Sequence, residues 1–149
     1  MKKDEVEIKI RNAEISDSES ITELSNQLGY KTLHTDIQNR LKRILEHREN
    51  CIYVATESGK VVGWIHGFYS MRVESDFCVE IGGLVVNDNF RKNGIGKKLV
   101  DKVIGWTELK NCEKVRVRCN VARTKSHKFY ERIGFKINKE QKIFNKRLN

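Results

Sequence analysis

The sequence predicts one α/β domain, in which helices cover a single mixed sheet whose N-terminal part is antiparallel. Two observations support this fold class. Apolar residues recur with the periods of strands and helices in the order β-α-α-β-β-β-α-β-α-β-β. No internal repeat, linker or change of composition marks a boundary within the 149 residues, and this length is typical of a single domain.

The first third of the chain predicts a strand and two helices. Alternating apolar residues indicate a half-buried strand; they are Val6, Ile8 and Ile10. Capping boxes at residues 16–19 and 35–38 each predict the start of a helix. The expected inner faces of these helices are Ile21, Leu24 and Leu28, with a stop at Gly29, and then Ile37, Leu41, Ile44 and Leu45.

The remaining elements follow from the same periodicities. Four strands are predicted, at residues 51–57, 61–70, 77–86 and 115–121, and the first two form a hairpin around the turn at residues 58–60. Two helices are predicted at residues 95–109 and 124–132, the second ending at Gly134. Phe135 begins the last strands, which we expect to run through Leu148.

Composition and charge limit the function classes. No apolar run is long enough to span a bilayer and the N-terminus has no apolar signal stretch, so we expect a cytoplasmic protein without a membrane partner. The net charge is +9, divided into −4 over residues 1–90 and +13 over residues 91–149. The basic part indicates a polyanionic partner, either nucleic acid or a phosphorylated cofactor. The four cysteines have no C-x-x-C spacing, so we expect buried thiols and no metal site.

A glycine-containing segment between the strand at 77–86 and the helix at 95–109 is the most specific local feature. Its sequence is Arg91-Lys92-Asn93-Gly94-Ile95-Gly96-Lys97-Lys98. The first amides of the helix have no intrahelical acceptor, and glycine lets a ligand approach the backbone, so the segment suits a pyrophosphate. A P-loop is excluded because Arg91 and Lys98 replace its first Gly and its Ser/Thr, and Leu99 replaces the third Gly of a dinucleotide fingerprint.

With this segment the sequence resembles the GNAT superfamily of acyl-CoA-dependent N-acetyltransferases. Arg91–Gly96 looks like that family's [QR]-x-x-G-x-[GA] motif, and Lys128–Phe135 looks like its second signature, F/L-Y-x-x-x-G-F. The resemblance extends from Val6 to Leu148. It implies a central, mostly antiparallel mixed sheet with splayed fourth and fifth strands and about four flanking helices.

The resemblance also implies acetyl-CoA as co-substrate. In this family pantetheine pairs with the free amides of the strand before the glycine loop, which here is the strand at 79–86. A free amide near Leu84 would polarise the thioester carbonyl. The implied cofactor-binding residues are Leu84, Val85, Val86, Arg91, Lys92, Asn93, Gly94, Ile95, Gly96 and Lys97.

Two catalytic residues follow from the same resemblance. Tyr130 matches the tyrosine that protonates or hydrogen-bonds the departing thiolate, although a core tyrosine is the alternative. Glu80 resembles the general base of histone-acetyltransferase members, although it can equally pair with a nearby arginine. Gly82 and Gly83 indicate a bulge or a close approach by ligand in the same strand. The family's pantetheine-binding Asn is replaced by Arg123, which can serve the cofactor phosphates instead.

We therefore predict an acetyltransferase that moves acetyl from acetyl-CoA to a primary amine by direct attack in a ternary complex. The expected acceptor is a small cationic amine, selected by residues 16–47, the loop at 69–77 and Trp64. A protein lysine or an N-terminal amine is the alternative acceptor. A non-catalytic acyl-CoA sensor and a basic nucleic-acid-binding module are alternatives from other classes. A homodimer is common among the proteins that the sequence resembles.

Overall fold

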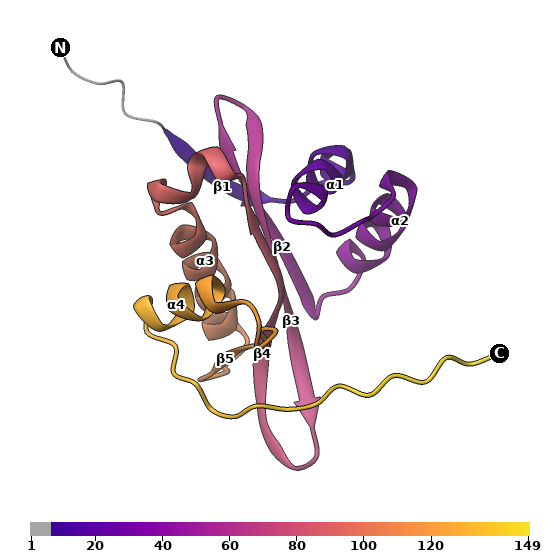
Figure 1. Cartoon of the computed structure of the whole chain (residues 1–149), viewed down its shortest axis with the longest axis vertical. Helices are drawn as coiled ribbons and strands as arrows, with labels where there is room; N and C mark the ends of the chain where they lie inside the picture. Colours follow the sequence, from indigo (N-terminus) through magenta and orange to yellow (C-terminus); the bar gives the residue numbers. More distant parts are fainter. Residues whose placement is uncertain (1–6) are drawn as a thin grey trace. The chain divides into compact units, whose positions relative to one another are not determined.

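Antiparallel strand pairs make up most of the sheet, as the alternating segments predict. The computed structural model describes residues 7–149, apart from the side chain of Lys92. Within these residues five strands form one sheet in the order β1-β2-β3-β4-β5 (Figure 1), and only β4 and β5 are parallel. The strands are β1 (Ile8–Asn12), β2 (Asn50–Glu57), β3 (Lys60–Arg72), β4 (Ser75–Val86) and β5 (Val115–Val117). Val6, expected in the first strand, lies outside the described residues.

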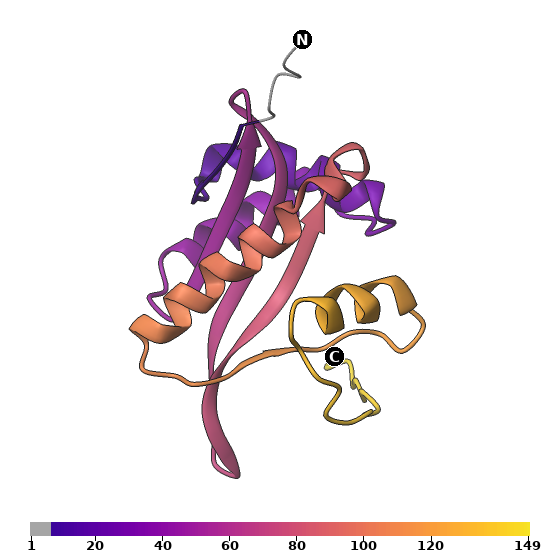
Figure 2. The same ribbon diagram turned by 90° about the vertical axis from the view of Figure 1, so that its left-hand side faces the viewer.

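Helices cover both faces of the sheet. The amphipathic helices α1 (Ser18–Gln27) and α2 (His34–Leu45) lie against one face, and α3 (Ile95–Leu109) lies against the opposite face (Figure 2). The core under α1 and α2 is a cluster of aliphatic side chains that includes Ile21, Leu24, Leu41, Ile52 and Val54. A second core lies between α3 and the opposite face of the sheet. Its aliphatic side chains are fully buried; they include Ile65 and Val79 of the sheet and Ile95, Leu99 and Val103 of α3. The predicted mixed α/β class is confirmed.

A β-bulge in β4 divides the sheet into a paired and a diverging part. His66 of β3 faces Gly83, and Gly67 faces Ile81, so Gly82 is an extra residue. On the other side of β4, β5 pairs only with Val79–Ile81. The predicted strand at 115–121 is therefore too long: past Val117 the bulged β4 offers it no partner. The predicted bulge and the divergence of the fourth and fifth strands are both present.

The predicted helix caps are displaced. α1 follows a turn of 3-10 helix, η1 (Ile15–Asp17), and the capping box is formed by Glu14 and Asp17 rather than by residues 16–19. Asp17 is fixed by Arg11, whose two guanidinium nitrogens lie 2.7 and 2.8 Å from its carboxylate oxygens, and this ion pair draws the turn toward β1. α2 begins one residue before Thr35, and no side chain caps its start. The left-handed stop at Gly29, with φ 86°, is confirmed.

The chain divides into two compact units, one ending at Arg118 and the other comprising Cys119–Asn149. The single-domain organisation therefore stays a prediction. In the second unit α4 (Thr124–Arg132) forms where the sequence predicts it, and Gly134 follows it with φ 104°. The strands predicted from Phe135 to Leu148 are wrong, because residues 133–149 form neither helix nor strand. Their apolar side chains are exposed, so no partner strand buries them; they include Ile137, Ile143, Phe144 and Leu148.

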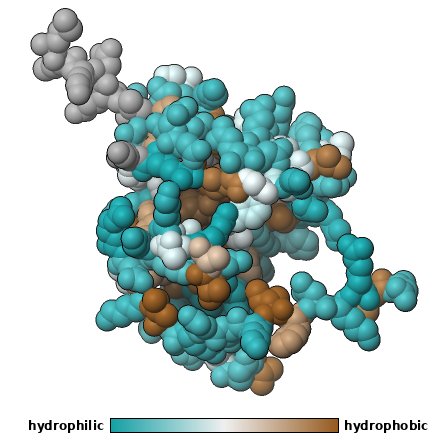
Figure 3. Space-filling view, viewed as in Figure 1, coloured by the Kyte–Doolittle hydropathy of each residue, from teal (hydrophilic) through white to brown (hydrophobic). Residues whose placement is uncertain are grey.

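One face of the molecule is mostly hydrophilic. Polar and charged residues cover most of the face shown in Figure 3, and apolar residues appear there in separate places. Among the described residues no helix is both long and apolar enough to cross a bilayer.

Candidate functional site

The bulge in β4 turns two backbone amides toward the edge that β5 has left. Before the bulge, the Val79 N–H donates to the Lys114 carbonyl on the β5 side, at 3.1 Å. After it, the Asn87 N–H donates to Val62 of β3, at 2.8 Å. Because backbone groups alternate in direction along a strand, the N–H groups of Leu84 and Val86 point away from β3. They lie beyond the last β5 pair and face an edge where an extended ligand can bind as a strand would.

The segment after β4 presents further backbone donors. A 3-10 helix, η2 (Asp88–Asn93), leads to Gly94, whose φ of 70° requires the left-handed region that glycine adopts without strain. α3 starts directly after it, and the first intrahelical bond runs from the Lys98 N–H to the Gly94 carbonyl, at 3.1 Å. The amides of Ile95, Gly96 and Lys97 therefore precede the helical ladder, at the positive end of the helix dipole.

Several basic side chains of this segment are already paired. Arg91 lies 2.7 Å from Asp88, and Lys97 lies 2.8 Å from Asp101; all four side chains are exposed. Exposed pairs of this kind contribute little, so both cations can be redirected to an anion at small cost. Ile95 is fully buried, so only its backbone can contact a ligand. The segment therefore offers an anion both the first main-chain amides of α3 and the exposed side chains of Arg91 and Lys97.

Glu80 of β4 is surrounded by arginines. Its carboxylate is buried, and its Oε1 atom accepts from Arg72 at 3.3 Å, Arg116 at 3.3 Å and Arg118 at 3.4 Å. Arg72 ends β3, Arg116 lies opposite Glu80 in β5, and Arg118 follows β5. The arginine pairing that the sequence left open is thus present. The function of Glu80 as a general base stays a prediction.

An aromatic strip of β3 lies beside Glu80, on the face of the sheet that carries α1 and α2. Phe68 is the register partner of Glu80, and the His66 ring lies 5.7 Å from the Phe68 ring. The His66 Nε2 atom is hydrogen-bonded to the Asn50 Oδ1 atom at 2.9 Å, and burial lowers the pKa of His66. Trp64 packs beside the α1–α2 core, and its indole N–H has no hydrogen-bond partner within the described part of the chain. Sequence reasoning singled out Trp64 but missed His66.

The two central glycines of β4 make room for this strip. A Cβ on Gly82 would lie 2.9 Å from the His66 Nδ1 atom, and a Cβ on Gly83 would lie 2.7 Å from the Trp64 ring. Larger side chains at these positions would displace both rings. The glycines are therefore explained by close packing as well as by the bulge.

Tyr130 lies in the second unit, on α4. Its ring packs edge-on against Phe129 and Phe135, with ring centroids 5.0 and 5.4 Å away, and the Phe135 N–H donates to its carbonyl. Nearby, the Asn120 side chain accepts from the Ala122 N–H, and the Asn120 carbonyl lies 2.9 Å from the His127 Nε2 atom. Asn120 and His127 thus shape the turn before α4. The catalytic function of Tyr130 and the phosphate contact of Arg123 stay predictions.

Two of the four cysteines are buried in the sheet. Cys78 is fully buried in β4, and burial raises the pKa of the Cys51 thiol to about 12. Cys119 was expected in a strand but lies after β5. Within residues 7–149, no three side chains of the types that hold metals come together.

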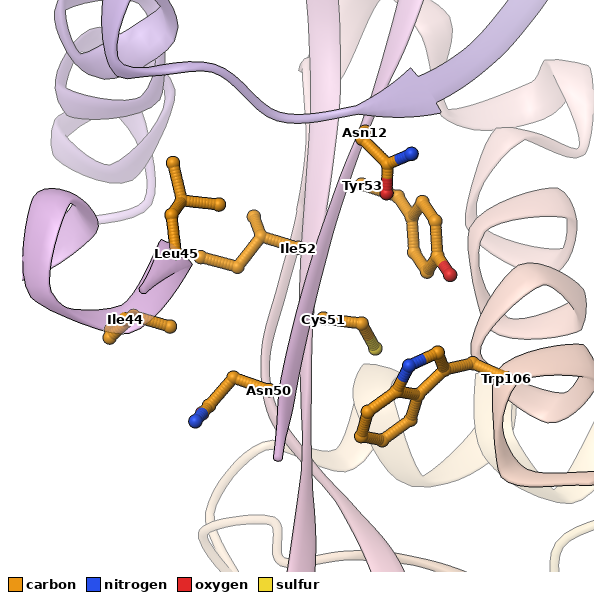
Figure 4. Close-up of a pocket in the computed structure, with 8 residues that line it drawn as sticks. All are labelled: Asn12, Ile44, Leu45, Asn50, Cys51, Ile52, Tyr53 and Trp106. Atoms are coloured by element: carbon orange, nitrogen blue, oxygen red, sulfur yellow. The ribbon is translucent and has the colours of Figure 1, made fainter. Parts of the chain in front are cut away.

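A separate hollow of about 290 Å³ lies around the start of β2, which β3 separates from β4. Figure 4 shows Cys51, Tyr53 and Trp106 on one side of the strand and Ile44, Leu45 and Ile52 on the other. Burial raises the pKa of Tyr53 as well as that of Cys51, so neither supplies an anion or a base at neutral pH. This hollow does not have the groups that acyl transfer requires.

Known proteins share this architecture. The model of the acetyltransferase (GNAT) family matches residues 17–135. An N-acetylaspartate synthetase of Danio rerio is 32% identical over 104 residues, which cover 70% of this chain and 36% of that protein. An uncharacterized N-acetyltransferase of Chlorobaculum tepidum is 30% identical over 140 residues, covering 91% of this chain and 82% of the other.

Solved structures agree in fold. The aminoglycoside N-acetyltransferase AAC(6')-Iy in complex with CoA has a TM-score of 0.86 at 21% identity, covering 96% of this chain and 97% of that one. AAC(6')-Ig of Acinetobacter haemolyticus has a TM-score of 0.84 at 15% identity, covering 95% and 99%. The chain thus belongs to the acetyltransferase (GNAT) family. It spans little more than a third of the length of the N-acetylaspartate synthetase that it matches.

Proposed function

We propose that the protein is an acetyl-CoA-dependent N-acetyltransferase that acetylates a primary amine by direct attack. The observation that best supports this function is the continuous run of backbone donors from the open edge of β4 to the start of α3. Leu84 and Val86 offer amides at that edge, and α3 follows with its unpaired N-terminal amides. An extended arm that ends in a diphosphate matches both kinds of donor.

The chain's residues divide the binding of acetyl-CoA between them. The edge of β4, at Leu84, Val85 and Val86, pairs with the pantetheine arm. The backbone of residues 94–97 holds the diphosphate, with charge from Arg91 and the neighbouring lysines. The chain also resembles a solved acetyltransferase that binds CoA.

The same residues support the chemistry of transfer. The Leu84 N–H donates to the thioester oxygen as that oxygen gains negative charge. The amine nitrogen forms a bond to the carbonyl carbon while the carbon–sulfur bond breaks. Tyr130 gives a proton or a hydrogen bond to the leaving sulfur, and Glu80, directly or through water, takes the proton that the amine loses. Buried Cys78 is unsuited to carrying the acetyl group, which supports direct transfer.

The acceptor is a primary amine. Relatives and structural neighbours include proteins named for aspartate and for aminoglycosides, so small molecules with an amine are the favoured class. A small cationic amine stays a prediction from the sequence, as does a homodimer. Protein lysine and N-terminal amines are alternative acceptors.

Binding experiments test this function against its rivals. Acetyl-CoA at about 100 times its Kd is expected to stabilise the protein by about 2.7 kcal/mol in a thermal shift assay. NADH and duplex DNA serve as comparison ligands, and we expect neither to match acetyl-CoA. Stabilisation by DNA but not by acetyl-CoA would instead favour a nucleic-acid-binding module.

A thiol-release assay with acetyl-CoA and a panel of amines then separates an enzyme from an acyl-CoA sensor. We expect at least one primary amine to accelerate the release of CoA thiol. Binding of acetyl-CoA without thiol release for any amine would favour the sensor.

A further inference from the structure

The arginines around Glu80 leave positive charge unneutralised beside the proposed acetyl-transfer edge. Arg72 and Arg116 pair with no carboxylate other than Glu80 within residues 7–149. Even without Arg118, two guanidinium groups therefore face one carboxylate. The cluster, defined as Arg72, Arg116, Arg118 and Glu80, has a net positive charge.

The contacts within the cluster are long for charge-assisted hydrogen bonds. The three arginine–Glu80 distances are 3.3 to 3.4 Å, and all of them end on the same oxygen atom. By contrast, the pair of Arg11 and Asp17 is bidentate, at 2.7 and 2.8 Å. A guanidinium fork prefers two short bonds to a planar anion. Glu80 alone does not satisfy that preference for Arg72 and Arg116.

The arginines are also open to a ligand. Glu80 keeps only 8% of its side chain exposed, whereas Arg72, Arg116 and Arg118 keep 38%, 22% and 39%. Arg116 is paired with Glu80 in register, so it lies on the face of Glu80 and of α1 and α2, and Arg118 reaches the same carboxylate from the segment after β5. Because the arginine side chains are partly exposed, a small anion can reach the guanidinium groups on the face of the sheet that carries α1 and α2.

The position of the cluster separates it from the diphosphate site. Glu80 lies six residues before Val86, which corresponds to about 20 Å of strand, and α3 begins further on. It lies next to the point where β4 and β5 part, one residue from their last pair. The cluster is thus placed to contact the acceptor rather than the phosphates of the coenzyme.

We propose that the arginines of this cluster bind a carboxylate of the acceptor, so that the preferred substrate is a small primary amine that bears a carboxylate. This inference rests on the proposed acetyltransferase function and specifies its substrate class. A cationic amine would meet net positive charge at the same place, so the cluster disfavours the cationic acceptor expected from the sequence.

Three small primary amines that differ in their second charged group test this substrate class: aspartate, which bears carboxylates, ethanolamine, which has no second charged group, and 1,3-diaminopropane, which has a second ammonium. We expect kcat/KM for aspartate, measured by thiol release, to exceed that for either other amine by about tenfold or more. A higher kcat/KM for ethanolamine or diaminopropane would leave acetyl transfer intact and overturn the carboxylate subsite.

Variants of the cluster test whether its arginines cause the preference for a carboxylate-bearing amine. Arg116→Gln is expected to raise KM for aspartate about tenfold, with a much smaller change in kcat and in the kinetics with ethanolamine. Arg72→Gln, at the more exposed end of β3, should act in the same direction and serves if Arg116→Gln does not fold. Arg48→Gln, an exposed arginine before β2, is the matched control and should leave KM unchanged. An unchanged KM for aspartate in both cluster variants would overturn the proposal.

A binding probe without an amine separates this inference from the proposed function. Succinate is expected to raise the melting temperature of the wild type and of Arg48→Gln, but less that of Arg116→Gln. If no amine releases thiol, the proposed function fails while succinate still tests the subsite. Equal shifts in all three proteins, or no shift in any, would overturn the subsite.

Discussion

The amides of Leu84 and Val86 owe their direction to one extra residue. If Gly82 followed the regular alternation instead of forming the bulge, the alternation that starts at Val79 would turn the amides of Gly83 and Val85 toward the open edge. The bulge therefore decides which donor can reach a thioester oxygen. Glycine suits this position because a side chain would strike His66.

Tyr130 offers a direct test at the residue scale. In Tyr130→Phe the ring should keep its packing against Phe129 and Phe135, while the hydroxyl is lost. We expect kcat to fall at least about tenfold, because proton donation to the leaving sulfur is removed, with little change in the Kd for acetyl-CoA. Steady-state kinetics and calorimetry measure the two quantities.

The control for this experiment is Tyr53→Phe; Tyr53 is a tyrosine of β2 that lines the separate hollow, and this variant should keep its activity. A wild-type kcat in Tyr130→Phe would remove Tyr130 from the mechanism.

Features of the site that depend on neighbouring residues could be predicted from the sequence. Groups that come together from separate strands could not. The loop at Gly94 and the bulge at Gly82 are encoded by neighbouring residues, so spacing and residue type suffice. The arginines around Glu80 come from β3, from β5 and from the segment after it, and their convergence depends on strand register. The alternation of Arg116 and Arg118 was the available signal, but it does not say which strand they face.

Among the elements, the junction between β1 and α1 is held by a single carboxylate. Asp17 accepts the Glu14 N–H at 2.8 Å and pairs with Arg11 in two bonds. Burial acts to raise the pKa of Asp17, but its bonds to Arg11 and to the Glu14 amide outweigh burial and hold that pKa below its ordinary 3.8. Because the folded pKa is lowered, this stabilisation is present above about pH 4 and is lost as the pH falls through the folded pKa.

Asp17→Asn is therefore expected to lower the free energy of unfolding by about 1–2 kcal/mol at pH 7. The difference from the wild type should shrink below pH 4, when the wild-type carboxyl is protonated as well. Urea unfolding followed by circular dichroism measures this, with Glu23→Gln on the exposed face of α1 as the control. A difference that stays constant down to pH 3 would contradict the ionic explanation.

Elements with their own periodicity were well predicted. α3 and α4 have the predicted bounds, and β2 to β4 extend the predicted strands by only a few residues. The errors fall where an element depends on a distant partner. β5 stops at Val117 because β4 diverges, and the segment from Phe135 to Leu148 alternates like a strand without pairing as one. Alternation indicates which face a strand would bury, but only a neighbouring strand supplies its hydrogen bonds.

At the scale of the whole molecule, our proposals give a function to the positive charge of the C-terminal part of the chain. The residues from 91 onward have a net charge of +13, which includes the loop that we propose for the diphosphate and two arginines of the Glu80 cluster. Positive charge therefore serves two anions in this account, one on the coenzyme and one on the acceptor. The Glu80 cluster lies beside β4, whereas the proposed diphosphate site lies after β4, at the start of α3, so they can be impaired separately.

Isothermal titration of acetyl-CoA into a Gly94→Val, Gly96→Val double variant tests the account most directly. Valine at Gly94 cannot adopt its φ of 70° without strain, and both side chains should keep a diphosphate from the first amides of α3. We expect the Kd to rise at least about 100-fold, a loss of about 2.7 kcal/mol, with wild-type affinity in Gly105→Ala, whose added Cβ meets open space. A folded double variant that binds acetyl-CoA as tightly as the wild type would contradict it.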